Sequence, residues 1–172
     1  LPIPNILCQT FCMKKLTATL CLTLTLLLGS AGVSWSADYQ KGLTAFLSGD
    51  YATALREWKP LAEQGNVRAQ YNLGAMYEKG QGVLQDDKTA MKWTRLAAKQ
   101  GHAIAQSNLG FMYDKGRGVS QDHKTAVKWT RLAAEQGNAN AQSNLGVMYR
   151  NGRGVPQDDK TAVKWTRLAA EQ

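Results

Sequence analysis

The feature that most constrains this chain is a segment that repeats. KTAVKWTRLAAEQ occurs at 124–136 and again at 160–172, and the near copy KTAMKWTRLAAKQ occupies 88–100. These copies set a period of 36 residues, which in an alanine-rich, proline-poor sequence is typical of stacked helical hairpins. No second helix follows the last copy. We expect this copy to cap the array, to belong to a longer array or to pack against another subunit. The helical repeats cover 52–172, as units 52–87, 88–123 and 124–159 and a partial unit 160–172.

Each unit predicts two helices, separated by residues that typically begin or end a helix. The repeated segment forms one of them, named here the Trp helix because a tryptophan recurs in it. An aspartate before it can cap its N-terminus, and a glycine after it can take the left-handed C′ position. The caps are Asp86, Asp122 and Asp158, and the glycines are Gly65, Gly101 and Gly137.

The other helix of each unit, named the Leu-Gly helix, carries AQYNLGAMYEKG or a close variant of it. It is expected to end at Gly80, Gly116 or Gly152, each of which opens a Gly-x-Gly-Val loop. Upstream of the repeats, residues 37–51 predict a capping helix at about 38–47 and a turn.

Several of these motifs resemble known repeat families. The Leu-Gly-x-x-Tyr core, with Leu109, Gly110 and Tyr113 in the second unit, is shared with tetratricopeptide repeats. The period and the Gly-x-Gly-Val loop instead resemble the Sel-one-like repeat (SLR) family, an αα-solenoid relative of the tetratricopeptide repeat. The resemblance covers about 52–172 and implies an all-α fold, a right-handed αα-hairpin solenoid of about eight helices.

The start of the chain predicts export from a bacterial cell. Lys14 and Lys15 precede an apolar stretch at 16–28 and a small-residue segment, which is the three-part plan of a secretory signal peptide at 13–36. We expect cleavage after Ser36 or one residue later, and a periplasmic or secreted product. A membrane anchor is the alternative, although the stretch is shorter than the roughly 20 residues that span a bilayer. Residues 1–12 are interpreted as an upstream extension of a start assigned too early.

The sequence contains few residues that could catalyse a reaction or bind a metal. All three cysteines (Cys8, Cys12 and Cys21) precede the expected cleavage site, so the mature chain would lack thiolate metal sites and disulfides. His102 and His123 have no repeated acidic or nucleophilic partner, and we expect exposed loop residues there. We therefore predict no enzyme activity, no cofactor and no metal. A β-lactam-binding or β-lactamase-like enzyme is the alternative implied by some cysteine-rich bacterial members of the family.

The Leu-Gly helix has a constant face and a variable face. Placed at 100° steps, the residues that are the same in all units cluster on one side, and those that differ lie roughly opposite. The equivalent tetratricopeptide helix lines a ligand-binding groove, so the resemblance implies that the variable face binds a protein or peptide; drift of exposed positions is the alternative. The candidate groove residues are Arg68, Tyr71, Ala75, Glu78, Ile104, Ser107, Phe111, Asp114, Asn140, Ser143, Val147 and Arg150.

The Trp helix carries a basic stripe opposite its alanines and tryptophan, which we expect in the core. The formal net charge is +8. Like charges one turn apart destabilise a helix by about 0.2–0.5 kcal/mol per pair, so the stripe either attracts an anionic envelope surface or is a solvated face. Nucleic acid is not predicted, because no aromatic residues interleave with the charges. The candidate basic residues are Lys88, Lys92, Arg95, Lys124, Lys128, Arg131, Lys160, Lys164 and Arg167.

Overall fold

A computed structural model of the chain describes residues 37–172. The predicted extension and signal peptide, with the three cysteines, lie outside the described residues. The described part contains eight α-helices and no strand, which confirms the all-α prediction. The helices are α2 (Tyr39–Leu47), α3 (Tyr51–Glu63), α4 (Val67–Lys79), α5 (Asp87–Lys99), α6 (Ala103–Lys115), α7 (His123–Glu135), α8 (Ala139–Arg150) and α9 (Asp159–Ala170).

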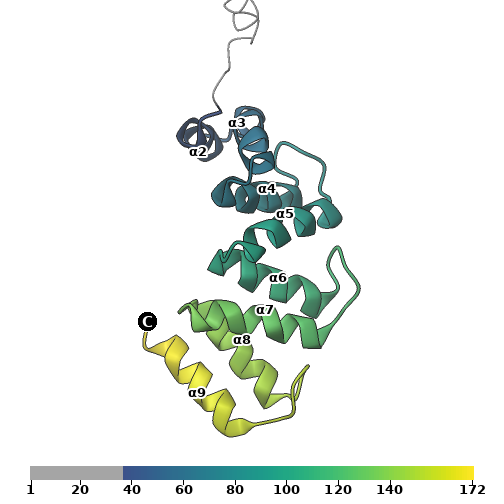
Figure 1. Cartoon of the computed structure of the whole chain (residues 1–172), viewed down its shortest axis with the longest axis vertical. Coiled ribbons are helices and arrows are strands. Elements are labelled where there is room, and N and C mark those ends of the chain that lie inside the picture. Colours follow the sequence, from purple (N-terminus) through teal and green to yellow (C-terminus); the bar gives the residue numbers. More distant parts are fainter. Residues whose placement is uncertain (1–36) are drawn as a thin grey trace, which may run out of the picture. The chain divides into compact units, whose positions relative to one another are not determined.

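These helices stack as a series of hairpins within the described part (Figure 1). The Trp helices are α3, α5, α7 and α9, and the Leu-Gly helices are α4, α6 and α8. Each Leu-Gly helix packs most extensively on the Trp helix that follows it, and each Trp helix then packs on the next Leu-Gly helix. The result is a helical-hairpin solenoid. No helix in the described residues is both long enough and apolar enough to cross a bilayer.

The predicted caps of the Trp helices are confirmed, and so are the ends of α4 and α6 at Gly80 and Gly116, whereas α8 ends at Arg150 with Asn151 as its C-cap. The side chain of Asp86 accepts a hydrogen bond from the amide of Lys88, at 2.9 Å. Asp122 accepts from the amides of Lys124 and Thr125 at the start of α7, and Asp158 accepts from the amide of Thr161 at the start of α9. The glycines after the Trp helices are left-handed, with φ between the 84° of Gly137 and the 95° of Gly65. These local hydrogen bonds satisfy backbone groups that a helix end would otherwise leave unpaired.

The core is divided into three clusters, whose buried members come from α2 to α4, from α5 and α6, and from α7 and α8. Alanines, a leucine and a methionine make up most of each cluster, and they are almost fully buried. Trp93, Trp129 and Trp165 are half-buried and pack against the first, second and third cluster respectively. The tryptophans therefore belong to the core, as predicted, and small alanines let the helices approach closely.

The glycine of the Leu-Gly pair marks the closest approach of two helices. A Cβ on Gly110 would lie 3.1 Å from the carbonyl oxygen of Ala126 and would collide with the Thr130 hydroxyl. Gly74 and Gly146 meet Thr94 and Thr166 in the same manner. A larger residue at this position would push the two helices of the hairpin apart.

A relay of buried glutamines joins each hairpin to its neighbours. Gln106 on α6 donates to the carbonyl of Ala98 at the end of α5, at 3.1 Å. Its own carbonyl oxygen accepts from Gln136 at the end of α7, at 2.6 Å. Gln70 and Gln142 repeat both bonds in the flanking hairpins. The repeated Ala-Gln and Gln-Gly pairs of the sequence are thereby explained as one hydrogen-bonded unit.

Candidate functional site

The variable positions of the Leu-Gly helices lie mainly at the surface, but two of them are buried. Ser107 and Asp114 are almost completely covered, so the expectation that the whole variable face is open is wrong at these two positions. Tyr71, Ala75 and Glu78 are half-buried. The exposed members are Arg68, Ile104, Phe111, Asn140, Ser143, Val147 and Arg150.

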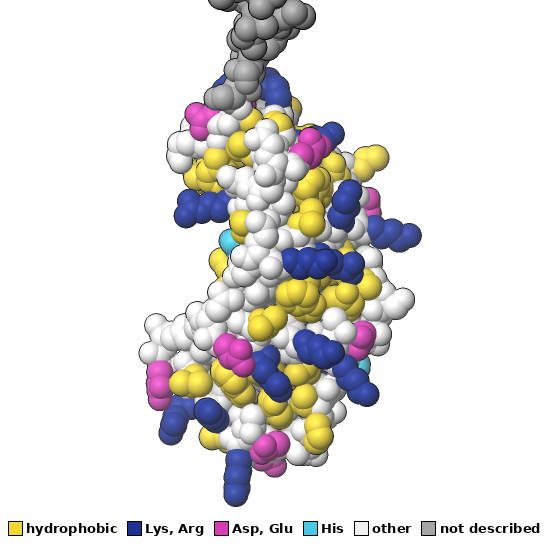
Figure 2. Space-filling view, in the orientation of Figure 1, with side chains coloured by type: hydrophobic (Ala, Val, Ile, Leu, Met, Phe, Trp, Pro, Cys, Tyr) yellow, Lys and Arg dark blue, Asp and Glu magenta, His cyan; other side chains and the backbone are white. Residues whose placement is uncertain are grey.

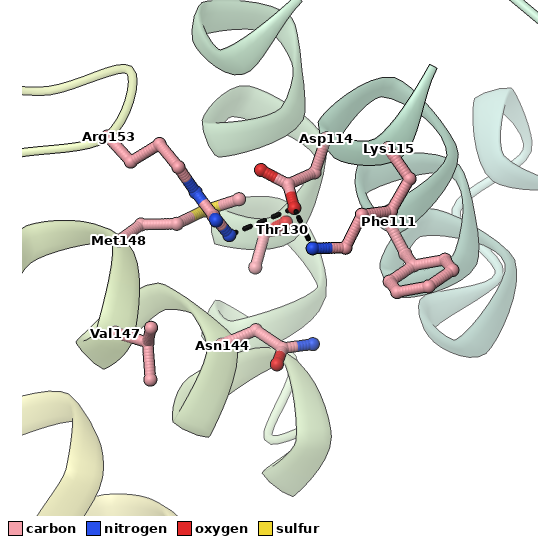
Figure 3. A pocket seen from close by; sticks show the side chains of 8 residues that line it. All are labelled: Phe111, Asp114, Lys115, Thr130, Asn144, Val147, Met148 and Arg153. Carbon is pink, nitrogen blue, oxygen red and sulfur yellow. Dashed lines mark hydrogen bonds and ion pairs between the residues drawn. The ribbon is translucent and has the colours of Figure 1, made fainter. Parts of the chain in front are cut away.

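Two adjoining hollows lie between α6 and α8, and Phe111 and Asn144 line both of them. The first also contains Asp114, Thr130 and Arg153 (Figure 3). The second is neutral and polar, with lining residues Ser107, Asn108, Phe111, Asn140, Ser143 and Asn144. The structure thus brings together predicted residues from two successive Leu-Gly helices at one indentation of the surface.

Two exposed apolar side chains, Phe111 and Val147, line these hollows, and a third, Ile104, is exposed on α6. Ile104 is 47% exposed, Phe111 43% and Val147 40%. Phe111 and Val147 hold equivalent positions one repeat apart, and Ile104 lies two helical turns before Phe111 on α6. An aromatic ring and an aliphatic side chain beside a polar hollow can cover an apolar side chain of a ligand while amides bind its polar groups.

Asp114 is the centre of a buried ion-pair cluster rather than an open groove residue. Its carboxylate lies 2.9 Å from Arg153 and 3.2 Å from Lys115 through Oδ2, and 3.1 Å from His123 Nδ1 through Oδ1 (Figure 3 shows the first two). The Asp114 side chain is only 4% exposed, so desolvation makes these partners necessary to it. Asp114 therefore joins two repeats instead of facing a ligand.

The arginine inside the Gly-x-Gly loop joins two repeats, a role that the sequence analysis did not predict. Arg117 spans the previous repeat junction in the same way as Arg153, binding Glu78 at 2.8 Å and Asp87 at 3.0 Å. The second glycine of the loop lets the chain approach that closely, because a Cβ on Gly118 would overlap the Asp87 carbonyl. The separation of 39 residues between arginine and acid, which recurs in both junctions, was the available signal.

Both histidines make contacts that the sequence did not predict. His102 caps α6, with Nδ1 accepting from the amide of Ala105 at 3.2 Å, and its ring stacks on Tyr71. Burial, together with the nearby charge of Arg68, lowers the pKa of His102. His123 is half-buried beside Asp114. Neither histidine is an exposed loop residue, and within the described part no three His, Cys, Asp or Glu side chains are grouped to hold a metal.

The predicted basic residues divide into two kinds. The six lysines of the stripe are exposed, and basic side chains are spread over the visible face in Figure 2. Arg95 instead donates to the Tyr113 hydroxyl at 2.8 Å, and Arg131 makes the same bond to Tyr149. These two arginines connect a Trp helix to the following Leu-Gly helix, while Arg167 is exposed.

The repeat frame of the folded chain matches a known family. The model of the Sel1 repeat matches residues 67–102, 103–138 and 139–172. The chain belongs to the Sel1 repeat family. Each Sel1 repeat begins with the Leu-Gly helix, whereas the units defined from the sequence begin with the Trp helix. The period of 36 residues is the same in both divisions. The last Trp helix, α9, closes the third Sel1 repeat with α8.

Solved structures show the same fold. A Sel1 repeat protein from Oxalobacter formigenes is 38% identical, with a TM-score of 0.75 over 78% of this chain and 55% of that one. A protective antigen of uropathogenic Escherichia coli strains, displaying an SLR fold, is 39% identical, with a TM-score of 0.74 over 80% of this chain and 31% of that one. The chain thus spans about half or less of their lengths.

A more distant structure shares the fold alone. The cysteine rich protein B of Helicobacter pylori is 19% identical, with a TM-score of 0.56 over 71% of this chain and 87% of that one. No curated protein sequence matches the chain. Proteins built of Sel1 repeats are generally scaffolds for protein–protein interaction.

Proposed function

We propose that this Sel1 repeat protein is an exported adaptor that binds a peptide or protein segment along the exposed side of α4, α6 and α8. The observation that carries the proposal is that two exposed apolar residues, Phe111 and Val147, line the hollows between α6 and α8. Ligand sites are typically concave, with apolar walls and a few convergent polar groups. The hollows are lined by both apolar and polar side chains.

The chemistry of the surface favours an uncharged, partly apolar ligand segment. The amides of Asn108, Asn140 and Asn144 and the hydroxyl of the exposed Ser143 can donate to and accept from a peptide backbone. Burying Phe111 and Val147 against a ligand removes apolar area from water at about 25 cal/mol per Å². Polar groups would fix the register, and the apolar side chains would supply most of the affinity.

Affinity capture with matched variants tests the binding surface. The double variant F111A/V147A removes two apolar side chains beside the hollows. The control L96A/L132A removes two leucines from the Trp helices α5 and α7, where Leu132 is 44% exposed, close to the exposure of Phe111. Immobilised full-length protein should retain a partner from the native cell envelope in wild-type and control form, and lose most of it in F111A/V147A. Equal recovery by both variants would place binding elsewhere.

The exported location is a separate part of the proposal. It rests on the signal-peptide plan of residues 13–36. N-terminal sequencing of the protein purified from the envelope should give a mature chain that begins at Ala37 or one residue later. A chain that begins at Leu1 or Met13 in that fraction would contradict cleavage.

A further inference from the structure

One tyrosine fills the space between the first two Leu-Gly helices. The Tyr71 ring from α4 stacks on His102 at the start of α6, with ring centroids 4.8 Å apart. The side chain of Asn108 on α6 lies beside its hydroxyl. Tyr71 also packs against the core cluster of the following repeat. The junction between α4 and α6 is therefore occupied by a side chain of the protein itself.

The corresponding tyrosine is missing between α6 and α8. Ser107 stands one repeat after Tyr71, and Asn144 stands one repeat after Asn108. The neutral hollow opens at this place, with Phe111 as one wall. Asn144 is exposed and makes no hydrogen bond to any other described residue. Of the earlier asparagines, Asn72 donates to the Tyr39 hydroxyl at 3.1 Å, and Asn108 lies beside the Tyr71 hydroxyl. The second junction thus keeps the hydrogen-bonding group but lacks the phenol that it would bind.

We infer that this hollow is a socket for a tyrosine side chain of the bound partner. The proposal rests on the proposed function, because the partner segment would lie along the same surface. The partner's ring would take the space that Tyr71 takes one repeat earlier and would cover the exposed Phe111 ring, in an aromatic contact. Its hydroxyl would accept from the Asn144 amide. No charged side chain lines the hollow, which favours a neutral phenol over a carboxylate or an ammonium group.

Peptide titration of the isotope-labelled full chain tests the socket. The probe is the blocked tripeptide acetyl-Gly-Tyr-Gly-amide, compared with peptides that have Phe or Asn in the centre. The side-chain amide resonances of Asn144 should shift with the tyrosine peptide, and the phenylalanine peptide should bind about 5- to 10-fold more weakly because it lacks the hydroxyl. Absence of an Asn144 shift up to roughly 10 mM peptide, equal binding of phenylalanine, or tighter binding of asparagine would overturn the socket.

Two reciprocal variants use the repeat itself as a control. S107Y places a tyrosine of the chain in the socket and should weaken tyrosine-peptide binding more than tenfold. Y71S should open a second socket, so that Asn108 resonances also shift on titration and the number of bound peptides rises from one to about two. Undiminished binding by S107Y would overturn the proposal, and so would an unchanged Asn108 in Y71S if S107Y does not fold.

The outcomes separate the socket from the proposed function. If the partner captured from the envelope is lost in F111A/V147A but no tyrosine peptide binds, the adaptor surface stands and the tyrosine socket is wrong. If the tyrosine peptide binds at Asn144 but capture is unaffected by F111A/V147A, the socket stands and the proposed path of the partner is wrong.

Discussion

At the scale of single residues, the closest contacts in the repeat involve glycine. Gly110 has an ordinary helical conformation, so its role is the room it leaves for Thr130 and for the backbone of α7. An alanine would gain about 1 kcal/mol of helix propensity there, but overpacking of a well-packed contact costs about 1–3 kcal/mol. The difference between the gain in helix propensity and the cost of overpacking decides whether packing requires glycine at position 110.

We expect G110A to lower the free energy of unfolding by about 1–2 kcal/mol, measured by urea denaturation. The double variant G110A/T130A should recover part of the loss, because it removes the hydroxyl that the new Cβ meets. K99A, on the exposed end of α5, serves as a control with a change of a few tenths of a kcal/mol. A G110A protein as stable as the wild type would show that the helices can separate without cost.

His102 is the residue that should make stability depend on mild acid. Burial lowers its pKa, so the folded chain favours the neutral ring and the unfolded chain takes up the proton first. Its stabilising contribution is therefore complete above the ordinary value near 6.5 and is lost as the pH falls below it. The caps Asp86, Asp122 and Asp158 have pKa values lowered by hydrogen bonds from threonines, so their losses begin only in stronger acid.

The matched variant is H102N, because Asn66 and Asn138 cap α4 and α8 at the equivalent positions. Between pH 7.5 and 5 the wild-type Tm should fall more than that of H102N in thermal melts followed by circular dichroism. His123 is present in both proteins, so its contribution cancels in the comparison. Identical pH profiles would mean that His102 does not carry the effect.

At the scale of helices and hairpins, the glutamine relay connects three consecutive elements. Gln106 satisfies the last turn of α5 through Ala98 and receives a hydrogen bond from the end of α7. The side-chain nitrogen and the side-chain oxygen of Gln106 are both hydrogen-bonded in buried surroundings, where an unsatisfied carbonyl costs about 1–3 kcal/mol. The relay therefore sets how the end of each Trp helix meets the next Leu-Gly helix.

Q106A should lower the free energy of unfolding by about 1–3 kcal/mol in urea denaturation, because the Ala98 carbonyl loses its buried donor. Q85A is the control, since Gln85 is exposed and should change stability by no more than a few tenths of a kcal/mol. Equal effects of the two variants would show that water replaces the Gln106 side chain.

At the scale of the whole repeat array, ion pairs between repeats couple one hairpin to the next. Stacked repeats are stabilised by contacts with their nearest neighbours, so a broken junction weakens cooperativity as well as stability. The two junctions differ in burial: Asp114 is 4% exposed in its pair with Arg153, and Glu78 is 29% exposed in its pair with Arg117. Burial should make the Asp114 junction the more sensitive of the two.

We expect D114A to destabilise the array by about 2–4 kcal/mol, because Arg153 and Lys115 lose a buried counter-ion. E78A should cost less than about 1 kcal/mol, as partly exposed pairs generally do. Urea denaturation monitored by tryptophan fluorescence measures both variants. A larger loss in E78A than in D114A would contradict the ranking by burial.

The sequence by itself determined the repeat, the helices and the face of each helix that packs in the core. The aspartate caps and glycine stops act through hydrogen bonds within a few residues, and the helical period places leucine, glycine and tryptophan toward the core. These features depend only on neighbours along the chain, so the all-α hairpin solenoid could be predicted from them.

Only the tertiary structure decided which variable positions are open. Ser107 and Asp114 vary between repeats as Phe111 does, yet both are buried, and Asp114 is paired with Arg153 of the next repeat. The partner of Asp114 lies 39 residues away in a loop, where helical periodicity carries no information. The hollow at Ser107 likewise exists because Tyr71 has no counterpart one repeat later. Exposure and partnership are set by the neighbouring repeat, and for that reason they could not be read from one helix at a time.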